Sequence, residues 1–583
     1  MDAITTRGGA WLLDEATGIF SPERLTPEHR LMAQTTDEFV DQEVLPSLAR
    51  LEAGDWQVAR SLVRRAGELG LLGVNVPDAY GGLDLDKVSS LIVAERIARA
   101  ASFATTYGGQ ANLCILPIVL FGTAAQKEQY LPRLVSGEMV GAYALSESGS
   151  GSDALAARTR ATRGPDGTWR LTGEKMWITN GGFADVIIVF AKVDGEHFTA
   201  FIVEKRFPGV SAGREEHKMG LHGSSTTSIL LQEASVPAGN VLGEVGKGHK
   251  VALNTLNFGR FKLGGMSVGG CRTAIGDAAR YAAARRQFGQ PIAAFGAIKH
   301  KLGDMTARTY AIESLVYRTA GLIDAALAES HDGAVVARAF EEYAVEASIA
   351  KVAGTETLDY VLDENVQIHG GNGYVSDYSA ERYYRDARVN RIFEGTNEIN
   401  RLLIAGMLVR RAVKGDLPLI AAARRLQDDL LSATSSLPST GGALDGELST
   451  VAAFKKVALM VLGTAMQTYG QALTEEQEVL GYAADILMDT YAAESAVVRA
   501  RAGIAAGERA ELHDAAARVF VSDAAQRVDH AARSALAAMA EGDTLRTLLA
   551  ALRRVLKPPP VNTVALRRRL ADATVARGRY ILD

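Results

Sequence analysis

Arg391-Ile-Phe-Glu-Gly-Thr-Asn-Glu-Ile399 is the most informative stretch of this 583-residue sequence. It sets a single carboxylate, Glu394, beside the apolar side chains of Ile392 and Phe393 and before Gly395, which permits a tight turn. An apolar lining and a bound ligand would remove water from this carboxylate, and its pKa would then rise toward the pH at which a general base accepts a proton. The structural alternative is a turn ending at the glycine, a threonine cap for the next helix, and an acid at its positive end.

Two polar segments upstream add to this stretch. Ala144-Leu-Ser-Glu-Ser-Gly-Ser-Gly-Ser-Asp153 combines two glycines, which allow close backbone approach, with serine hydroxyls. Gly173-Glu-Lys-Met-Trp-Ile-Thr-Asn-Gly-Gly182 alternates into the strand-like residues 186–191, so Trp177 and Thr179 are predicted on one side of an extended segment. Such an indole and hydroxyl would cover and hydrogen-bond a flat ring. The segments are typical of a flavin site spread over two domains, although a surface turn and a core tryptophan explain each one separately.

Two further pairs of motifs follow in order along the chain. Lys218-Met-Gly-Leu-His-Gly-Ser-Ser-Thr226 precedes Val236-Pro-Ala-Gly-Asn-Val-Leu-Gly243, and Arg285-Arg-Gln-Phe-Gly289 precedes Gln367-Ile-His-Gly-Gly-Asn-Gly-Tyr374. Together with the segments above, they resemble the acyl-CoA dehydrogenase family over about residues 30 to 410. The closest resemblance is to its very-long-chain branch, which has an additional C-terminal domain.

The resemblance implies a mainly helical α+β fold. The expected units are an N-terminal extension (1–30), an N-terminal α-helical domain (31–140), a middle β-barrel domain (141–247), a four-helix bundle with Glu394 (248–410) and an additional C-terminal helical domain (411–583). The periodicity agrees, because helical spacing gives way to short alternating strands in the middle of the chain and then returns. Within the bundle, a helix is predicted from Phe340 to Gln367, with Gly370 and Gly371 as its C-cap.

By its position, Glu394 resembles the catalytic base of the family. The implied reaction removes the α-proton of an acyl-CoA thioester while the β-hydrogen leaves as hydride to N5 of FAD, which gives a trans-2-enoyl-CoA, as in fatty acid β-oxidation. In the family, the backbone N–H of the base and a flavin ribityl hydroxyl hold the thioester carbonyl and stabilise the developing enolate. Two members place the base on the helix that carries Asn257 and Arg260, but the matching residue here is Gly259, which has no side chain and leaves Glu394 as the candidate.

The resemblance also assigns an FAD site in two parts. Residues expected to border the flavin ring are Tyr143, Leu145, Ser146, Trp177, Thr179 and Thr396, with Ser152 near phosphate or substrate. The dinucleotide half is expected to be held across a subunit interface by Arg285, Gln287, Phe288, Gln367, Gly370 and Gly371. A monomer would then not complete the site. In the very-long-chain branch the additional domain replaces half of the tetramer packing, so a homodimer is predicted, with a tetramer as the alternative.

Arg260 and Asn257 are the predicted contacts to the CoA part of the substrate. They lie one helical turn apart, and a cation suits a polyphosphate ligand. Asn257 replaces the acid common in shorter-chain relatives, and the alternative for Arg260 is a solvated helix face. Gly395 beside the base completes the expected substrate contacts.

Gly108 and Gly109 bear on chain length. They lie in Thr105-Thr-Tyr-Gly-Gly-Gln-Ala-Asn-Leu-Cys-Ile115, which aligns with the helix at the floor of the acyl pocket, where bulkier residues shorten the cavity. A glycine costs a helix interior about 1 kcal/mol against alanine. The pair therefore predicts an open floor and a long acyl chain, with close helix packing as the alternative.

Composition and charge restrict the other possibilities. Hydrophobic residues make up 47% of the chain, enough for several buried cores, and the two cysteines indicate a reducing compartment. Neither they nor the ten histidines show a metal-binding spacing. A net charge of −5 argues against nucleic acid as the main partner. The N-terminus lacks targeting features and no apolar run approaches a spanning helix of about 20 residues, so a bacterial cytoplasmic location is expected.

The end of the chain has a basic amphipathic pattern, formed by Leu548, Leu552, Arg553, Arg554, Leu556, Lys557 and residues 567–569. Peripheral contact with anionic lipid is one prediction for this surface. A solvated face or a subunit contact is the alternative.

Three functions differ in what happens to the electrons. A dehydrogenase is expected to pass them to an electron-transfer flavoprotein. An acyl-CoA oxidase would share the base and the flavin but use dioxygen. A non-catalytic binding or assembly role would need neither, and the presence of Glu394, Arg260 and the flavin motifs counts against it.

Overall fold

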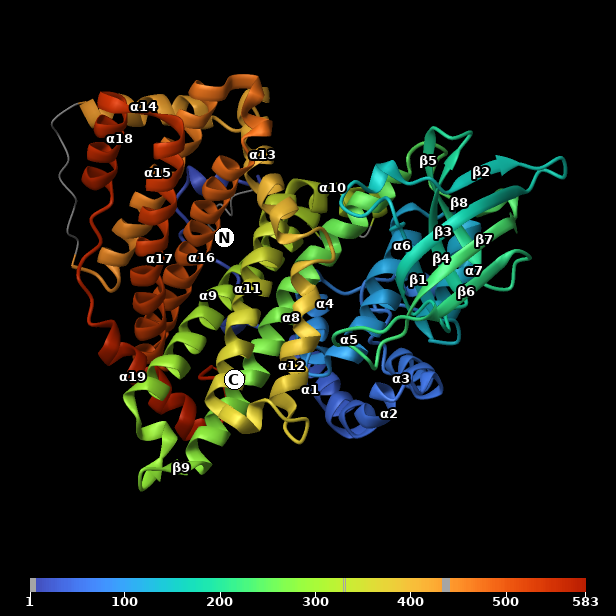
Figure 1. The fold of residues 1–583 in the computed structure, drawn as a ribbon, viewed down its shortest axis with the longest axis horizontal. Coiled ribbons are helices and arrows are strands. Elements are labelled where there is room, and N and C mark those ends of the chain that lie inside the picture. Colours follow the sequence, from blue (N-terminus) through green and yellow to red (C-terminus); the bar gives the residue numbers. More distant parts are fainter. Residues whose placement is uncertain (1–6, 329, 331, 432–440, 583) are drawn as a thin grey trace.

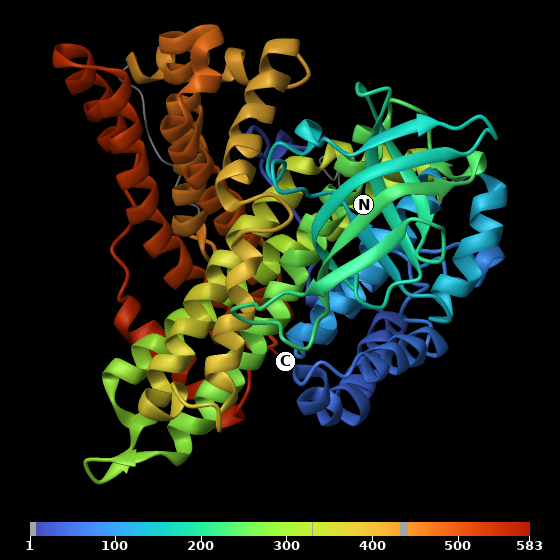
Figure 2. The ribbon, with the colours of Figure 1, turned by 45° about the vertical axis from the view of Figure 1, so that its right-hand side comes forward.

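The computed structural model describes residues 7–328, 330, 332–431 and 441–582. Helices, then strands, then helices follow one another as expected, and a further helical region forms the C-terminus, so the predicted fold class is confirmed. Figures 1 and 2 show the sheet and the N-terminal helices on one side of the long central helices, and the C-terminal helices on the other.

The N-terminal helices are α1 (Pro27–Phe39), α2 (Leu48–Glu52), α3 (Trp56–Glu68), α4 (Lys87–Ile97), α5 (Ala101–Gly108), α6 (Leu116–Phe121) and α7 (Ala124–Val135). Four of them begin at a side chain that accepts the backbone N–H three residues later, namely Thr26, Asp55, Asp86 and Thr123. Between α5 and α6 the helix widens to π spacing over Gly109–Ile115. Such π segments often mark functional sites, and this one coincides with the predicted pocket floor.

The middle strands are β1 (Gly141–Ala144), β2 (Arg160–Arg163), β3 (Trp169–Thr179), β4 (Val186–Val193), β5 (His197–Glu204), β6 (Val210–Glu215), β7 (Thr226–Val236) and β8 (Val241–Leu242). They form one sheet in the order β6-β7-β3-β2-β4-β5-β8, with β1 parallel to β4. The middle β domain is thus confirmed. The sheet is buried at β4, whose residues 186–191 have no exposed side chain.

The central helices are α8 (Gly248–Ala284), α9 (Gly296–Leu327), α10 (Gly333–Glu342), α11 (Ala344–His369), α12 (Ser379–Ala387) and α13 (Asn397–Lys414). A small hairpin of β9 (Arg286–Gln287) and β10 (Gln290–Pro291) separates α8 from α9. The helix predicted from Phe340 is wrong at its start, because the chain leaves helical geometry at the buried Tyr343. Its end is as predicted, since Gly370 follows α11 with a φ of +59°.

The C-terminal helices are α14 (Leu419–Leu431), α15 (Asp445–Tyr469), α16 (Gln477–Ala506), α17 (Ala510–Met539), α18 (Gly542–Val555) and α19 (Thr563–Arg577). By length and apolar content, Asp445–Glu475 could cross a membrane, which the sequence analysis did not expect, but 78% of its most apolar window is buried inside the protein. On and after α18, Leu552 and Leu556 are also buried. The apolar side predicted to face lipid is therefore turned into the protein.

Residues 8–24 run between the central and the C-terminal helices. The backbone N–H of Gly9 and Nε1 of Trp11 donate to Oε1 of Glu346 on α11, at 2.6 and 3.0 Å. The Trp11 ring lies 4.9 Å from that of Tyr491 on α16. This segment is therefore part of the interface between the two helical regions.

Candidate functional site

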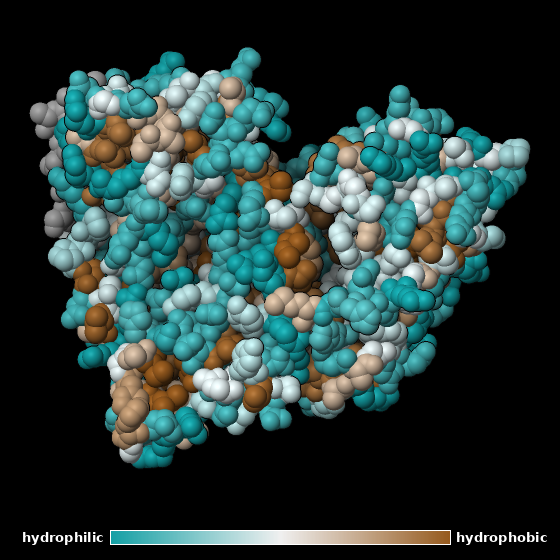
Figure 3. Space-filling model, viewed as in Figure 1, coloured by the Kyte–Doolittle hydropathy of each residue, from teal (hydrophilic) through white to brown (hydrophobic). Residues whose placement is uncertain are grey.

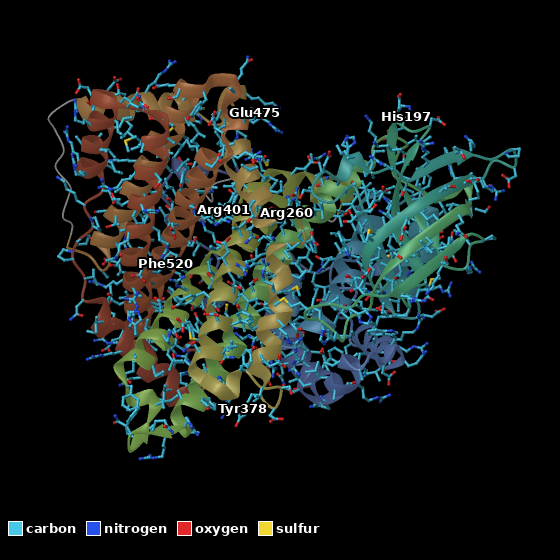
Figure 4. All side chains as sticks on the ribbon, viewed as in Figure 1. His197, Arg260, Tyr378, Arg401, Glu475 and Phe520 are labelled. Atoms are coloured by element: carbon cyan, nitrogen blue, oxygen red, sulfur yellow. The ribbon has the colours of Figure 1, made fainter. Side chains whose placement is uncertain are left out.

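The candidate site is the groove between the central helices and the sheet. Figure 3 shows the surface hollowed there, and Figure 4 places Arg260 on the helical side. The loop between α12 and α13, which carries Glu394, meets α8 at this point through a hydrogen bond to Arg260.

Glu394 occupies a strained turn before α13. Its φ is +57° and that of Gly395 is +77°, so two successive residues adopt the left-handed conformation. For a glutamate this conformation costs on the order of 1 kcal/mol or more, and it persists only where the surroundings hold it. Thr396 then caps α13 by accepting the backbone N–H of Ile399 at 3.3 Å, as the structural alternative predicted. The cap uses Thr396, so it leaves the Glu394 carboxyl group available.

The carboxyl group of Glu394 rests against the backbone of α8. A Cβ atom at Gly259 would lie 2.7 Å from Oε2, so only glycine leaves room for the group. The residue is partly exposed, but Oε2 itself is buried and has no hydrogen-bond partner in the described chain. Burial raises the pKa of Glu394 to about 7, against the opposing effect of the positive charges of Arg260 and Lys351. A carboxyl group with this pKa can accept a proton near neutral pH.

Arg260 is buried, with 4% of its surface exposed, so the solvated helix face is wrong. Its Nε donates to the backbone carbonyl of Glu394 at 3.1 Å, and Nη1 donates to Oδ1 of Asn257 at 3.0 Å. The predicted pair therefore forms, and it holds the loop of the candidate base. Its contact with CoA stays a prediction.

Lys351 and Asn400 hold the same loop, and the sequence analysis missed both. Nζ of Lys351, a buried residue of α11, donates to the carbonyl of Gly395 at 2.9 Å and to Oδ1 of Asn397 at 2.6 Å. Nδ2 of Asn400 donates to the carbonyls of Gly395 and Thr396 at 2.8 and 3.0 Å. One signal was available: Lys351 stands in an apolar stretch without an acid three or four residues away.

The Trp177 side chain is exposed and lies at an irregular position of β3. Its φ is +59°, and the pairing of β3 with β7 shifts between Lys175 and Ile178. The bulge interrupts the alternation of the strand, but Trp177 and Thr179 both belong to β3 with the buried Ile178 between them, so the predicted extended segment is confirmed apart from this irregularity. The Trp177 side chain is 58% exposed, which excludes a core tryptophan, and Thr179 is half-buried.

The serine- and glycine-rich loop after β1 is tied to β3 by a buried ion pair. Nζ of Lys175 donates to Oε1 of Glu147 at 2.7 Å and to the carbonyl of Leu145 at 3.1 Å. Of the predicted ligand contacts on this loop, Leu145 is buried, Ser146 half-buried and Ser152 exposed. The loop is thus fixed to β3 at Leu145 and Glu147, whereas Ser152 is exposed at its surface.

Tyr143, on β1, has a hydroxyl group that makes no hydrogen bond to the described residues. Its hydroxyl is buried and has no hydrogen-bond partner among the residues described. Burial raises the pKa of Tyr143 well above its usual value, and the nearby charge of Glu394 raises it further. Buried hydroxyl groups in proteins normally have a hydrogen-bond partner, and the described residues supply none for this one.

The residues predicted to hold the dinucleotide half lie away from the groove. Phe288, at the tip of the β9–β10 hairpin, is 93% exposed. The others, on the hairpin or at the end of α11, are exposed as well: Arg285, Gln287, Gln367, Gly370 and Gly371. Figure 1 shows the hairpin and the sheet on opposite sides of the molecule. Within one chain, the structure does not bring the two predicted halves of the FAD site together.

The two glycines of the predicted pocket floor differ. A Cβ atom at Gly109 would lie 2.9 Å from Nδ2 of Asn180, so close packing explains this glycine and the open floor predicted there is wrong. At Gly108 the nearest atom is Nδ2 of Asn112 at 3.7 Å, which leaves space for a side chain.

No other part of the described chain competes with this groove. A cavity of about 2540 Å³ lies between residues 12–25 and the C-terminal helices, but none of the predicted site residues lines it. Its buried charges are paired with one another, as Arg499 is with Glu23. No group of three or more His, Cys, Asp or Glu in the described ranges is arranged to hold a metal ion.

Models of one protein family match four parts of the sequence. Residues 26–138 match "Acyl-CoA dehydrogenase, N-terminal domain" and residues 142–234 match "Acyl-CoA dehydrogenase, middle domain". Residues 246–409 and 453–554 match two models that are both described as "Acyl-CoA dehydrogenase, C-terminal domain". The last match lies in the additional helical region.

Whole proteins give the same result. A probable acyl-CoA dehydrogenase of Bacillus subtilis (strain 168) is 47% identical over 588 residues, 99% of each chain. The mitochondrial very long-chain specific acyl-CoA dehydrogenase of Rattus norvegicus is 34% identical over 532 residues, 86% of this chain and 77% of that protein. The crystal structure of an acyl-CoA dehydrogenase complexed with FAD from Bacillus anthracis has a TM-score of 0.97 at 47% identity, over 99% of this chain and 100% of that one.

Proposed function

We propose, from the premise that this chain belongs to the acyl-CoA dehydrogenase family, that it oxidises an acyl-CoA to the trans-2-enoyl-CoA with Glu394 as the base. The environment of Glu394 carries the proposal. The Glu394 carboxyl group has one oxygen that is buried and without a hydrogen-bond partner among the described residues, and its pKa is raised to about 7. These are the properties required of a group that removes a weakly acidic α-proton near neutral pH.

The residues around the base prepare it for proton removal. Arg260 and Lys351 bind the carbonyls of Glu394 and Gly395, which fixes the loop before substrate arrives. Their positive charges favour the ionised carboxylate, whereas burial favours the protonated form. An acyl chain that fills the groove removes more water and strengthens each of these charge interactions.

FAD is the proposed cofactor, and it supplies the acceptor for the β-hydrogen, which leaves as hydride. The chain's residues fit a flavin, because the exposed Trp177 ring offers a flat face and the buried Tyr143 hydroxyl lacks a partner within the described chain. Thr179, Ser146 and Thr396 would border the ring, and Ser152 would approach phosphate. The hairpin with Phe288 would hold the dinucleotide half of FAD in a second copy of the chain, which is why we propose a homodimer.

The finer assignment concerns the acyl chain and the acceptor. A long acyl chain is proposed, supported by the space at Gly108 and by the similarity to the very long-chain relative through the C-terminal region. An electron-transfer flavoprotein is the proposed electron acceptor, and fatty acid β-oxidation the proposed process.

The test is an anaerobic titration of the purified holoenzyme with saturated acyl-CoAs of increasing length, followed by the absorbance of oxidised flavin. The wild-type flavin should bleach. Glu394→Gln should retain FAD and bind a 2-enoyl-CoA, but its flavin should be reduced at least about 100-fold more slowly, because an amide cannot accept the proton. Near-normal reduction of the variant would rule out Glu394 as the base.

A further inference from the structure

A chain of polar contacts leads from the C-terminal helices to the candidate base. It begins on α16, where Oδ1 of Asp485 accepts Nε of Arg401 at 2.8 Å. Arg401 lies on α13, between the groove and the C-terminal helices (Figure 4). Its two Nη atoms donate to the two carboxylate oxygens of Glu356 on α11, at 2.7 and 2.8 Å. A two-point contact of this kind fixes the orientation of both side chains.

The contacts continue inward from Glu356. Its Oε1 accepts Nδ2 of Asn397 at 3.0 Å, and Oδ1 of Asn397 accepts Nζ of Lys351 at 2.6 Å. Lys351 in turn donates to the carbonyl of Gly395, the residue after Glu394, at 2.9 Å. Asn397 and Lys351 are both buried, so these bonds are shielded from water.

Lys351 is an unusual cation to bury, because both hydrogen bonds of its Nζ go to neutral oxygens. Among the residues described, its strongest favourable charge interaction is with Glu394, followed by Glu356 and Glu398, and Arg260 opposes it. A buried lysine without a carboxylate in contact costs stability. Burying Lys351 has two effects on Glu394. Its hydrogen bond fixes the peptide group of Gly395, and its positive charge lies near the carboxyl group of Glu394.

We propose that Lys351 is a positioning residue for Glu394. The C-terminal helices help to hold Lys351 in place through the contacts of Asp485, Arg401 and Glu356. The inference rests on the proposed role of Glu394 as the base. It gives the additional domain a part in arranging the site, besides its packing. The strained left-handed turn at Glu394 is the element that this network holds.

The first test measures the loop itself, independently of turnover. Asp485→Asn removes the negative charge from the outermost contact and so weakens it. Asp489→Asn is the matched control, because Asp489 lies one turn further along α16 and pairs with Arg527 of α17 at 2.6 Å. Hydrogen exchange is followed in the FAD-bound enzyme for peptides that cover residues 388–401. Asp485→Asn should increase deuterium uptake there, and Asp489→Asn should not. Equal uptake in both variants would overturn the role of the C-terminal helices.

The second test uses the pH dependence of flavin reduction. The charged or titratable groups around Glu394 are Arg260 on α8, Lys351 on α11 and Tyr143 on β1. Lys351→Met removes a charge that lowers the pKa of Glu394, so the acid limb of the rate profile should move to higher pH. The maximal rate should also fall about 10- to 100-fold, since small misplacements of a catalytic group have effects of this size. Lys351→Arg should restore the position of the acid limb.

The outcomes separate the two claims. If Lys351→Met leaves the acid limb in place, or if Asp485→Asn leaves the loop protected, the corresponding part of the positioning role is wrong. If acyl-CoA does not reduce the wild-type flavin, the proposed function fails, while the hydrogen-exchange comparison still decides whether the network holds the loop. Asp485 is partly exposed, so Asp485→Asn should fold. The hydrogen-exchange comparison therefore remains possible even if Lys351→Met does not fold.

Discussion

The behaviour of Glu394 depends as much on the residue opposite it as on its own burial. Its carboxyl group fits against α8 because Gly259 has no side chain. The same contact keeps Oε2 out of water and so contributes to the raised pKa of the group. Gly259 therefore affects the base through this packing contact.

Gly259→Ala should slow flavin reduction about 100-fold, because the new Cβ atom displaces the carboxyl group and a shift of about 1 Å has an effect of this size. FAD content should not change. Gly406→Ala is the control, since Gly406 lies on α13 and a Cβ atom there would have nothing within 4 Å. A wild-type rate in Gly259→Ala, measured by stopped-flow absorbance, would contradict the contact.

The free energy of unfolding should also depend on the protonation of the buried Glu394 carboxyl group. The pKa of Glu394 is raised from 4.5 to about 7, so between these values the folded chain retains a proton that the unfolded chain has lost. The stabilising contribution is then fully present below about pH 4.5 and is lost as the pH rises through about 7. Glu394→Gln should therefore be more stable than wild type at pH 8, by on the order of 2–3 kcal/mol, and by less than about 1 kcal/mol near pH 5. Urea denaturation at both pH values checks this, and an equal difference at both would contradict it.

Sequence reasoning found Glu394 through a local motif that can be read along the chain, and Arg260 through its position in the family resemblance. It missed Lys351, whose role arises only when α11 packs against the start of α13, and Asn400, whose amide bonds carbonyls four and five residues earlier in its own chain segment. A buried lysine that bonds neutral oxygens leaves almost no local pattern, since its partners are 44 and 46 residues away.

At the scale of elements, the predicted floor of the acyl pocket is the helix from α5 to α6 with its π segment. The extra residue per turn in a π segment changes which side chains face the sheet. It brings Gly109 against Asn180, while Gly108 keeps open space beside it. Chain-length preference is therefore expected to depend on Gly108 and not on Gly109.

Gly108→Leu should shift the preference toward shorter acyl chains, because each methylene that can no longer be buried costs about 0.8 kcal/mol. The ratio of kcat/KM for a C16 to a C4 acyl-CoA should fall at least about tenfold. Gly481→Leu on α16, where a Cβ atom would have nothing within 4 Å, controls for the general effect of a leucine in a helix. An unchanged ratio would place the end of the acyl chain elsewhere.

Elements were predicted well where the signal was local. Helical spacing, strand alternation and the glycine end of α11 gave the order of elements correctly. The interruption at Tyr343 and the bulge at Trp177 were not predicted, because both residues are compatible with regular structure and depart from it only in the packed protein. The exposure of Trp177 follows from that departure.

For the whole molecule, the N-terminal segment joins regions that are far apart in sequence. Trp11 contacts Glu346 through its indole N–H and Tyr491 through its ring, across separations of 335 residues and more. Such contacts carry no local pattern, so residues 1–30 were expected only to be an extension. Its interface role required the structure.

Trp11→Ala should destabilise the protein by about 3–5 kcal/mol, because it empties a buried site between the two helical regions. Trp11→Phe should have a smaller effect, since it keeps a ring beside Tyr491 and removes only the N–H donor to Glu346. The first unfolding transition in urea is the measurement. Equal midpoints for Trp11→Ala and wild type would show that the segment does not stabilise the interface.

The β9–β10 hairpin, with Phe288 at its tip, and the sheet that borders the groove lie on opposite sides of one chain (Figure 1). In the proposed dimer, a defect in the hairpin of one copy and a defect in the base of the other would meet in a single groove and leave the second groove intact. Two separately inactive alleles, one carrying Phe288→Asp and one carrying Glu394→Gln, would then complement each other when expressed together. Up to about half of the grooves in such mixed dimers would be functional. Activity would then depend on which two chains pair in a dimer, and not on the sequence of either chain alone.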